Sequence, residues 1–112
     1  MTTAAQINEI ISLYTKHGWK LRRVLLSAAV KKLADEFDSG DAEVRESSIE
    51  ALWFSRRSRP GSESWEIRRL AGTPFALVEV FDDGTPEEEF EERIAETENR
   101  LEETLRKGNG SA

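Results

Sequence analysis

The sequence predicts an α+β fold, a two-layer α/β sandwich in which helices lie mainly on one face of a four-stranded sheet. Two observations carry this prediction: apolar residues recur at helical spacing near both ends of the chain, and short segments rich in β-branched and aromatic residues lie between them. No repeat or linker interrupts residues 1–107, so we expect one domain of ordinary size there. The Gly-rich segment 108–112 is predicted to be a disordered tail.

The chain is expected to begin with a helix from Ala4 to His17. Its apolar residues recur at intervals of three, one and three, and so form one stripe. These residues are Ile7, Ile10, Ile11 and Tyr14. Gly18 follows as the stop, because the left-handed conformation that is common after a helix costs a glycine little.

Two further elements are expected before the middle of the chain. Residues Trp19 to Leu26 alternate as a strand does, and Ser27 can cap a short helix that runs to about Phe37. This helix could be a crossover that makes the strands on either side of it parallel. The segment from Ala42 to Glu50 is expected to be extended or irregular.

Three strands are predicted to follow, at Ala51–Arg57, Trp65–Leu70 and Phe75–Phe81. The connections between them are short and contain the turn signals Pro60-Gly61 and Gly72-Thr73-Pro74. Short connections favour antiparallel neighbours, so we expect a meander and the overall order α-β-α-β-β-β-α. The strand order within the sheet stays open.

The last helix has the clearest boundary signals in the chain. Thr85 is the expected N-cap, Pro86 the first helical residue, and Glu88 completes a capping box. Acidic residues crowd its first turns and basic residues its end, which complements the helix dipole. Because this helix is expected to be longer than the strands beneath it, Leu101 and Leu105 are predicted to overhang the sheet, where they either fray or contact a partner.

Composition and charge exclude several classes of function. The chain carries a net charge of −6, and the segment from Asp82 to Lys107 alone holds eleven acidic and four basic residues. This acidity makes nucleic acid a poor partner. With no Cys and a single His, His17, the sequence has no recognisable catalytic or metal-binding constellation, so we expect no metal and no other cofactor. His17 is interpreted as a residue that complements the helix dipole.

The sequence also carries weak indications of location. The N-terminal residues lack the pattern of a signal peptide, and no apolar segment has the length needed to cross a bilayer. We therefore expect a cytoplasmic protein without a membrane partner. The excess of Arg over Lys is compatible with a GC-rich bacterial genome.

The most unusual pattern combines Arg pairs with Trp in the expected strands. Arg-Arg pairs occur three times, and three segments hold one Trp each. If side chains alternate across the sheet, Trp53 and Arg57 share one uncovered face, and Arg22 and Arg68 could join them. The expected contact surface is this face together with the edge around it, and its residues are Arg22, Trp53, Arg57, Trp65 and Arg68. Two interpretations stay open: a recognition surface in which Trp and Arg act as interface hot spots, or scaffolding in which Arg pairs with Glu across strands and covers Trp.

A second feature points to association. Both faces of the segment Phe75–Phe81 are apolar, whereas a strand buried on one side alternates. Either the N-terminal helix and loops cover the second face of this strand, or that face packs against another subunit or partner.

These features lead to a main hypothesis and two alternatives. The main hypothesis is a small non-enzymatic protein–protein interaction domain that uses the Trp/Arg face, with a second copy of itself or an acidic protein as its partner. The first alternative is a domain that binds a small molecule or an anion through a clamp of Arg22, Arg57 and Arg68. The second is an enzyme that uses Arg and Glu together with Tyr14 or His17.

Overall fold

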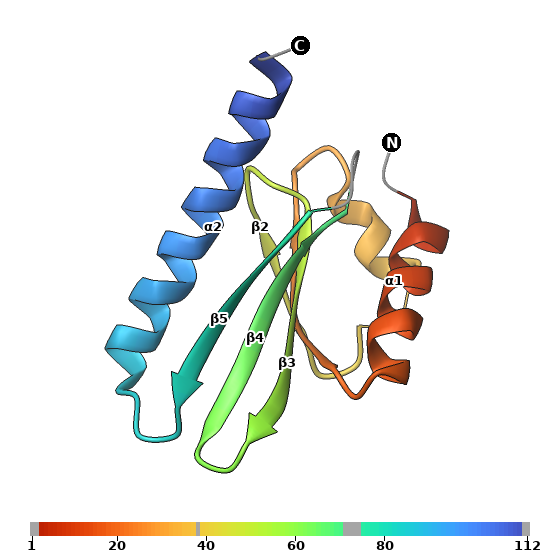
Figure 1. Cartoon of the computed structure of the whole chain (residues 1–112). Helices are drawn as coiled ribbons and strands as arrows, with labels where there is room; N and C mark the ends of the chain where they lie inside the picture. The colour runs from red at the N-terminus through yellow and green to blue at the C-terminus, as the bar shows by residue number, and fades with distance from the viewer. Residues whose placement is uncertain (1–2, 38, 71–74, 111–112) are drawn as a thin grey trace.

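The computed structural model describes residues 3–37, 39–70 and 75–110. In this part of the chain a five-stranded sheet separates two helical layers (Figure 1). Helix α1 (Ala4–Lys16) and the short 3₁₀ helix η1 (Lys31–Asp35) lie on one face, and helix α2 (Glu87–Gly110) lies on the other. The strands are β1 (Lys20–Leu26), β2 (Glu43–Glu46), β3 (Ala51–Arg59), β4 (Ser62–Arg69) and β5 (Ala76–Asp82). The predicted α+β class is confirmed.

The sheet is mixed, with the strand order β2-β1-β3-β4-β5. Strands β3, β4 and β5 form an antiparallel meander, and β1 pairs antiparallel with β3. Strand β1 also pairs in parallel with β2. The crossover expected after the first strand therefore leads to the edge strand β2 and not to β3.

Two details of the predicted architecture are wrong. The sheet has five strands because the segment Ala42–Glu50 contributes β2, whose four residues are all exposed and show no alternation that a sequence pattern could reveal. The helices cover both faces because β3 begins with the consecutive apolar residues Ala51, Leu52, Trp53 and Phe54, all fully buried. A strand that is apolar on both sides needs a layer on each side.

The helix boundaries follow local signals at the start of the chain and depart from them later. Thr3 caps α1 in a capping box with Gln6, and Gly18 has φ 86° directly after the helix, as predicted. The helix expected over Ser27–Phe37 is reduced to the five residues of η1. Helix α2 continues to Gly110 and so includes the first three residues of the segment 108–112, which was expected to be a disordered tail. Residues 111–112 of that segment and the turn signal at residues 72–74 lie outside the described residues.

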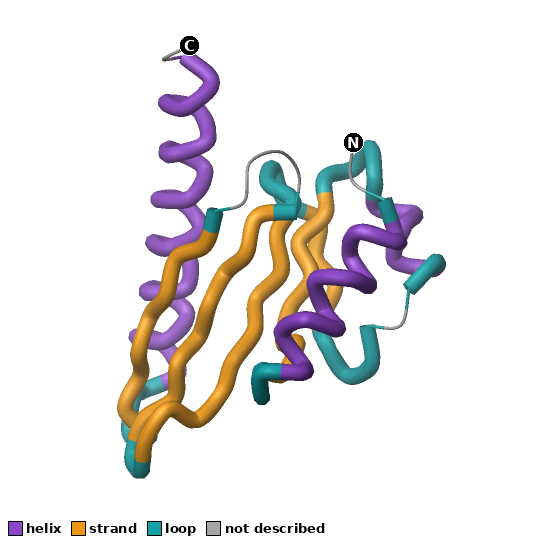
Figure 2. Tube along the Cα trace, turned by 45° about the vertical axis from the view of Figure 1, so that its right-hand side comes forward, coloured by secondary structure: helices purple, strands orange, loops and turns teal. Residues whose placement is uncertain are grey.

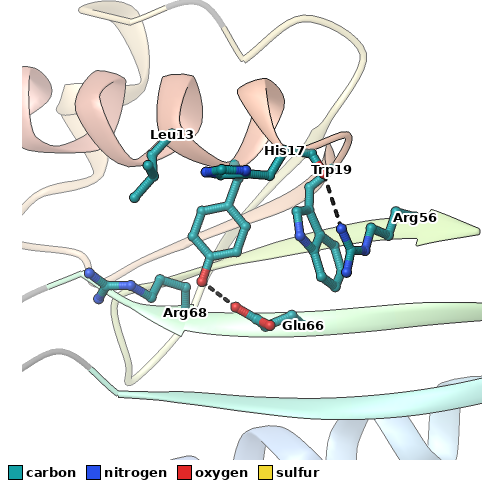
Figure 3. A pocket seen from close by; sticks show the side chains of 7 residues that line it. Leu13, His17, Trp19, Arg56, Glu66 and Arg68 are labelled. Atoms are coloured by element: carbon teal, nitrogen blue, oxygen red, sulfur yellow. Dashed lines mark hydrogen bonds between the residues drawn. The ribbon is translucent and has the colours of Figure 1, made fainter. Parts of the chain in front are cut away.

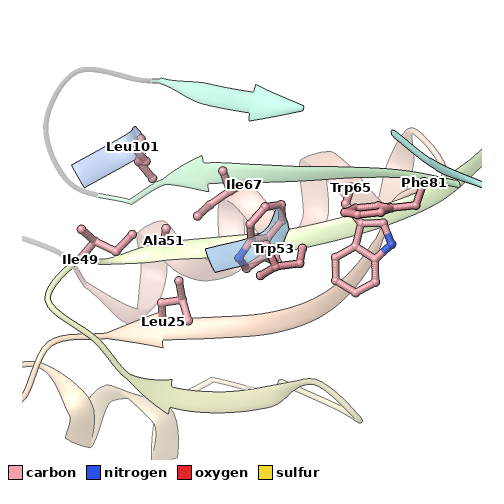
Figure 4. Packing of buried hydrophobic residues seen from close by; sticks show 9 residues of the cluster. Leu25, Ile49, Ala51, Trp53, Trp65, Ile67, Phe81 and Leu101 are labelled. Carbon is pink, nitrogen blue, oxygen red and sulfur yellow. The ribbon is translucent and has the colours of Figure 1, made fainter. Parts of the chain in front are cut away.

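The sheet divides the core into two hydrophobic clusters. The cluster beneath α2 includes Trp53, Trp65 and Phe81 from the strands and Leu101 from the helix (Figure 4). The cluster beneath α1 and η1 contains the strand residues of opposite parity, and its buried members include Ile7, Val24, Leu26, Leu52 and Phe54. Because Leu101 is fully buried and Leu105 packs against the same cluster, the prediction that both residues overhang the sheet is wrong.

Replacing Trp53 with alanine tests the second helical layer. Trp53 is 0% exposed, its indole nitrogen donates a hydrogen bond to Glu98 over 2.9 Å, and its ring meets Trp65 edge-on. Trp53→Ala is expected to lower the free energy of unfolding by about 3–5 kcal/mol, measured by urea denaturation with circular dichroism. Val78→Ala, at an exposed site, is the control and should cost less than about 1 kcal/mol. Equal losses in the two variants would contradict the assignment of Trp53 to the core.

Candidate binding groove

The five residues of the expected contact surface lie on both faces of the sheet. Trp53 and Trp65 point toward α2 and are buried, so the expectation that the face of Trp53 is uncovered is wrong. Arg68 lies three residues after Trp65 on β4, and it therefore points to the opposite face.

The register of β1 shifts between residues 21 and 23, and the Arg22 guanidinium lies 5.1 Å from the centre of the Trp65 ring. The Arg57 side chain pairs with Asp83 at one end of the sheet. The clamp of Arg22, Arg57 and Arg68 is consequently not assembled.

On the α2 side of the sheet, arginine side chains are neutralised by carboxylates. The Arg23 guanidinium is largely buried and donates to Glu91 over 2.7 Å. The Arg93 side chain, which comes from α2, forms an ion pair with Glu79 of β5. Together with the contact of Arg22 on Trp65, these pairs match the scaffolding interpretation of the Arg and Trp pattern.

A groove of about 460 Å³ lies on the other side, between α1 and the sheet (Figure 3). The C-terminal half of α1 and the turn after it form one wall, and side chains from β3 and β4 form the other. The residues that line the groove are Leu13, Tyr14, His17, Trp19, Arg56, Glu66 and Arg68. The groove thus brings together Arg, Glu, Tyr14 and His17, the residue types that the enzyme hypothesis required in one place.

Tyr14 anchors the centre of the groove. Its ring stacks on Phe54 with 4.1 Å between centroids, and its hydroxyl donates a hydrogen bond to the Glu66 carboxylate. Burial of the phenol, followed by the contact with Glu66, raises the pKa of Tyr14 above its usual range, and Arg68 opposes this effect. Tyr14 is therefore a protonated hydrogen-bond donor and is poorly suited to act as a base.

Trp19 and Arg56 form the second part of the groove. The Arg56 guanidinium lies 4.5 Å from the centre of the Trp19 ring and donates to the backbone carbonyl of His17 over 3.1 Å. These two contacts hold a cation at the C-terminal end of α1, where the helix dipole favours positive charge. His17 follows the last residue of α1 and so occupies the position that its dipole-complementing interpretation requires.

The groove continues into an uncovered part of the sheet. Figure 2 shows that α1 leaves the outer strands of this face open. Val78 lies opposite Glu66 in register and is 52% exposed, and Val80 is 43% exposed. Ala76 lies opposite Arg68 and is also exposed. We call Ala76, Val78 and Val80 the β5 strip.

The sequence pattern identified only part of this site. The helical stripe indicates Tyr14, the single His indicates His17, and an Arg pair indicates Arg68. Glu66 has no signal in the sequence beyond that of a Glu on a strand that can pair with Arg across the sheet. No signal in the sequence places Arg56 beside Trp19, because the two residues lie 37 positions apart and meet only through the pairing of β1 with β3.

Comparisons with known proteins provide no family for this chain. No protein-family model matches it, and neither a curated protein sequence nor a solved structure matches it. Within the described ranges, no group of three or more potential ligand residues could hold a metal ion. None of the helices in the same ranges is both long enough and apolar enough to cross a bilayer. The groove and the β5 strip are therefore interpreted from their own geometry.

The pKa of Tyr14 can be measured directly because the chain contains one Tyr. Absorbance of tyrosinate near 295 nm should rise at a higher pH in the native protein than in concentrated urea, where the usual value of about 10 applies. An unchanged midpoint in the two conditions would show that the phenol is not buried against Glu66.

The same shift predicts how stability depends on pH. The folded state holds the Tyr14 proton more tightly than the unfolded state, and this difference contributes to the free energy of unfolding. The contribution is complete below about pH 9 and is lost as the pH rises above 10. The free energy of unfolding should therefore fall faster for the wild type than for Tyr14→Phe, by up to about 1.4 kcal/mol per pH unit. Urea denaturation between pH 8 and about 10.5 measures this difference, and parallel curves would refute it.

Proposed function

We propose that this domain is a non-enzymatic protein–protein interaction module that docks its partner on the β5 strip and the adjacent groove. The observation that carries the proposal is the pair Val78 and Val80, two exposed β-branched side chains on a strand whose other face is already packed against α2. Apolar side chains gathered on an open sheet face are typical of interaction sites.

The two edges of the sheet support this interpretation by their contrast. Edge strand β2 is four residues long, and three of them are charged: Glu43, Arg45 and Glu46. Short, charged edge strands discourage association. Edge strand β5 has seven residues, and its three strip residues carry no charge. The Arg93 side chain donates to the Val80 carbonyl and so occupies part of this edge, which favours contact through the open face.

The surroundings of the strip have the composition of an interface. Trp19 and Arg56 lie in the groove beside it, and Trp and Arg are enriched among interface hot spots. The acidic helix α2 lies on the far side of the sheet, so its charge does not face a partner that docks on the strip. The proposal therefore retains an interaction module that uses Trp and Arg, but its contact surface is on the opposite face from Trp53.

Replacing Val78 with glutamate tests the docking surface. A carboxylate on the strip should oppose burial of this face, so Val78→Glu is expected to abolish association while leaving the fold intact. Light scattering measures whether the 12.7 kDa chain forms a dimer, and capture from lysate with mass spectrometry identifies a different partner.

Val44→Glu is the matched control. Val44 is an exposed valine on β2, at the other edge of the same sheet, and its replacement adds the same charge. The proposal requires an association that survives Val44→Glu and is lost with Val78→Glu. A monomer that captures no protein in a Val78-dependent manner would refute it.

A further inference from the structure

The groove carries positive charge that the protein leaves unpaired. The chain has a net charge of −6, and on the α2 side Arg23, Arg57 and Arg93 each pair with a carboxylate. In the described part of the chain, neither Arg56 nor Arg68 forms an ion pair. Each guanidinium donates to a backbone carbonyl, Arg56 to that of His17 and Arg68 to that of Arg69. Because a guanidinium has five N–H donors, further donors remain for the carboxylates of a partner.

The two cations are separated along the face of the sheet. Arg56 lies opposite Ser64 in register, and Arg68 lies four residues further along β4, a distance of about 13 Å along the strand. Between them lies Glu66, whose carboxylate already accepts the hydrogen bond from Tyr14. Two anionic groups that bind Arg56 and Arg68 must therefore lie apart from each other, one near each guanidinium group.

Apolar side chains lie alongside this row of charges. Val78 and Val80 flank it from β5, and Leu13 of α1, which is 53% exposed, flanks it from the helix. Helix α1 covers only part of this face (Figure 2), and Ala76, Val78 and Val80 stay exposed on β5. A partner helix that packed on them would lie beside α1 in the same layer.

A helix fits this space better than an extended segment. A strand gains its backbone hydrogen bonds at the edge of a sheet, and on the face of a sheet its N–H and C=O groups would have no partners. A helix satisfies its own backbone and presents only side chains. Acidic residues two turns apart on one stripe are about 11 Å apart, which the flexible side chains of Arg56 and Arg68 can accommodate.

We infer that the groove and the β5 strip together bind an amphipathic helix of a partner protein, with acidic side chains about two turns apart against Arg56 and Arg68 and apolar side chains against Leu13, Val78 and Val80. This inference rests on the proposed interaction function and specifies the chemistry of the partner. The observation that selects this chemistry is charge complementarity, since two unpaired cations border an apolar surface on an otherwise acidic protein.

A designed peptide provides the test. The probe is an alanine-based, terminally blocked helix of about 17 residues with two Glu seven positions apart and two Leu between them on the same stripe. Its matched controls carry Gln in place of both Glu, or Ser in place of both Leu. Binding to the full chain is measured by chemical-shift changes in heteronuclear NMR spectra and by anisotropy of a labelled peptide.

Substitutions in the protein locate the site. Arg68→Gln and Arg56→Gln are each expected to weaken binding of the Glu peptide about tenfold, because each removes a charge-assisted contact. Arg57→Gln changes the net charge equally on the other face of the sheet and should have no effect. The Gln peptide should bind weakly to the wild type, and its affinity should not fall further with Arg68→Gln, as expected for a double-mutant cycle.

Several outcomes would overturn the inference. These are equal affinity for the Glu and Gln peptides, a loss with Arg57→Gln as large as with Arg68→Gln, and no binding at about 1 mM peptide. If the wild type is a dimer that dissociates with Val78→Glu, the interaction function is retained, but the β5 strip binds a second copy of the chain. This result would overturn the inference that the strip binds a helix of a partner protein. An association that is indifferent to Val78 would instead contradict the docking surface itself.

Discussion

Burial of β3 on both sides is the constraint on which the rest of the structure depends. Four consecutive apolar residues, Ala51 to Phe54, point alternately to the two faces of the sheet, and both faces must be kept from water. Helix α2 covers Trp53 and its neighbours, and α1 covers Phe54. With these two layers in position, the α1-side face of β5 stays exposed at Val78 and Val80.

The same division separates the charges of the protein. Helix α2 holds most of the excess negative charge, and its side chains pair with arginines at its own face of the sheet, as Glu91 does with Arg23. The acidic helix α2 does not cover the α1 side of the sheet, where Arg56 and Arg68 lie. Glu66 lies between these two arginines and accepts the hydrogen bond from Tyr14. An acidic protein can thus present a locally cationic groove, because the sheet keeps its acidic helix on the other side.

The elements with local signals were predictable, and those that depend on long-range pairing were not. The capping box at Thr3 and the glycine at Gly18 bound α1 within a turn of its expected limits. The helix expected after Ser27 was shortened because apolar spacing over so few residues does not fix a helix without tertiary packing. Strand β2 was not predicted because all of its residues are exposed, so its sequence shows no alternation of apolar and polar residues.

The sequence by itself determined the α+β class, the approximate bounds of most strands and the two-sided apolar character of β5, because these follow from propensity and from periodicity along the chain. Only the tertiary structure decided which face each helix covers. Residue parity states that Trp65 and Arg68 lie on opposite sides of β4, but it does not state which side is open. That choice depends on packing between segments far apart in the chain, and it placed Trp53 in the core and Trp19 in the groove with Arg56.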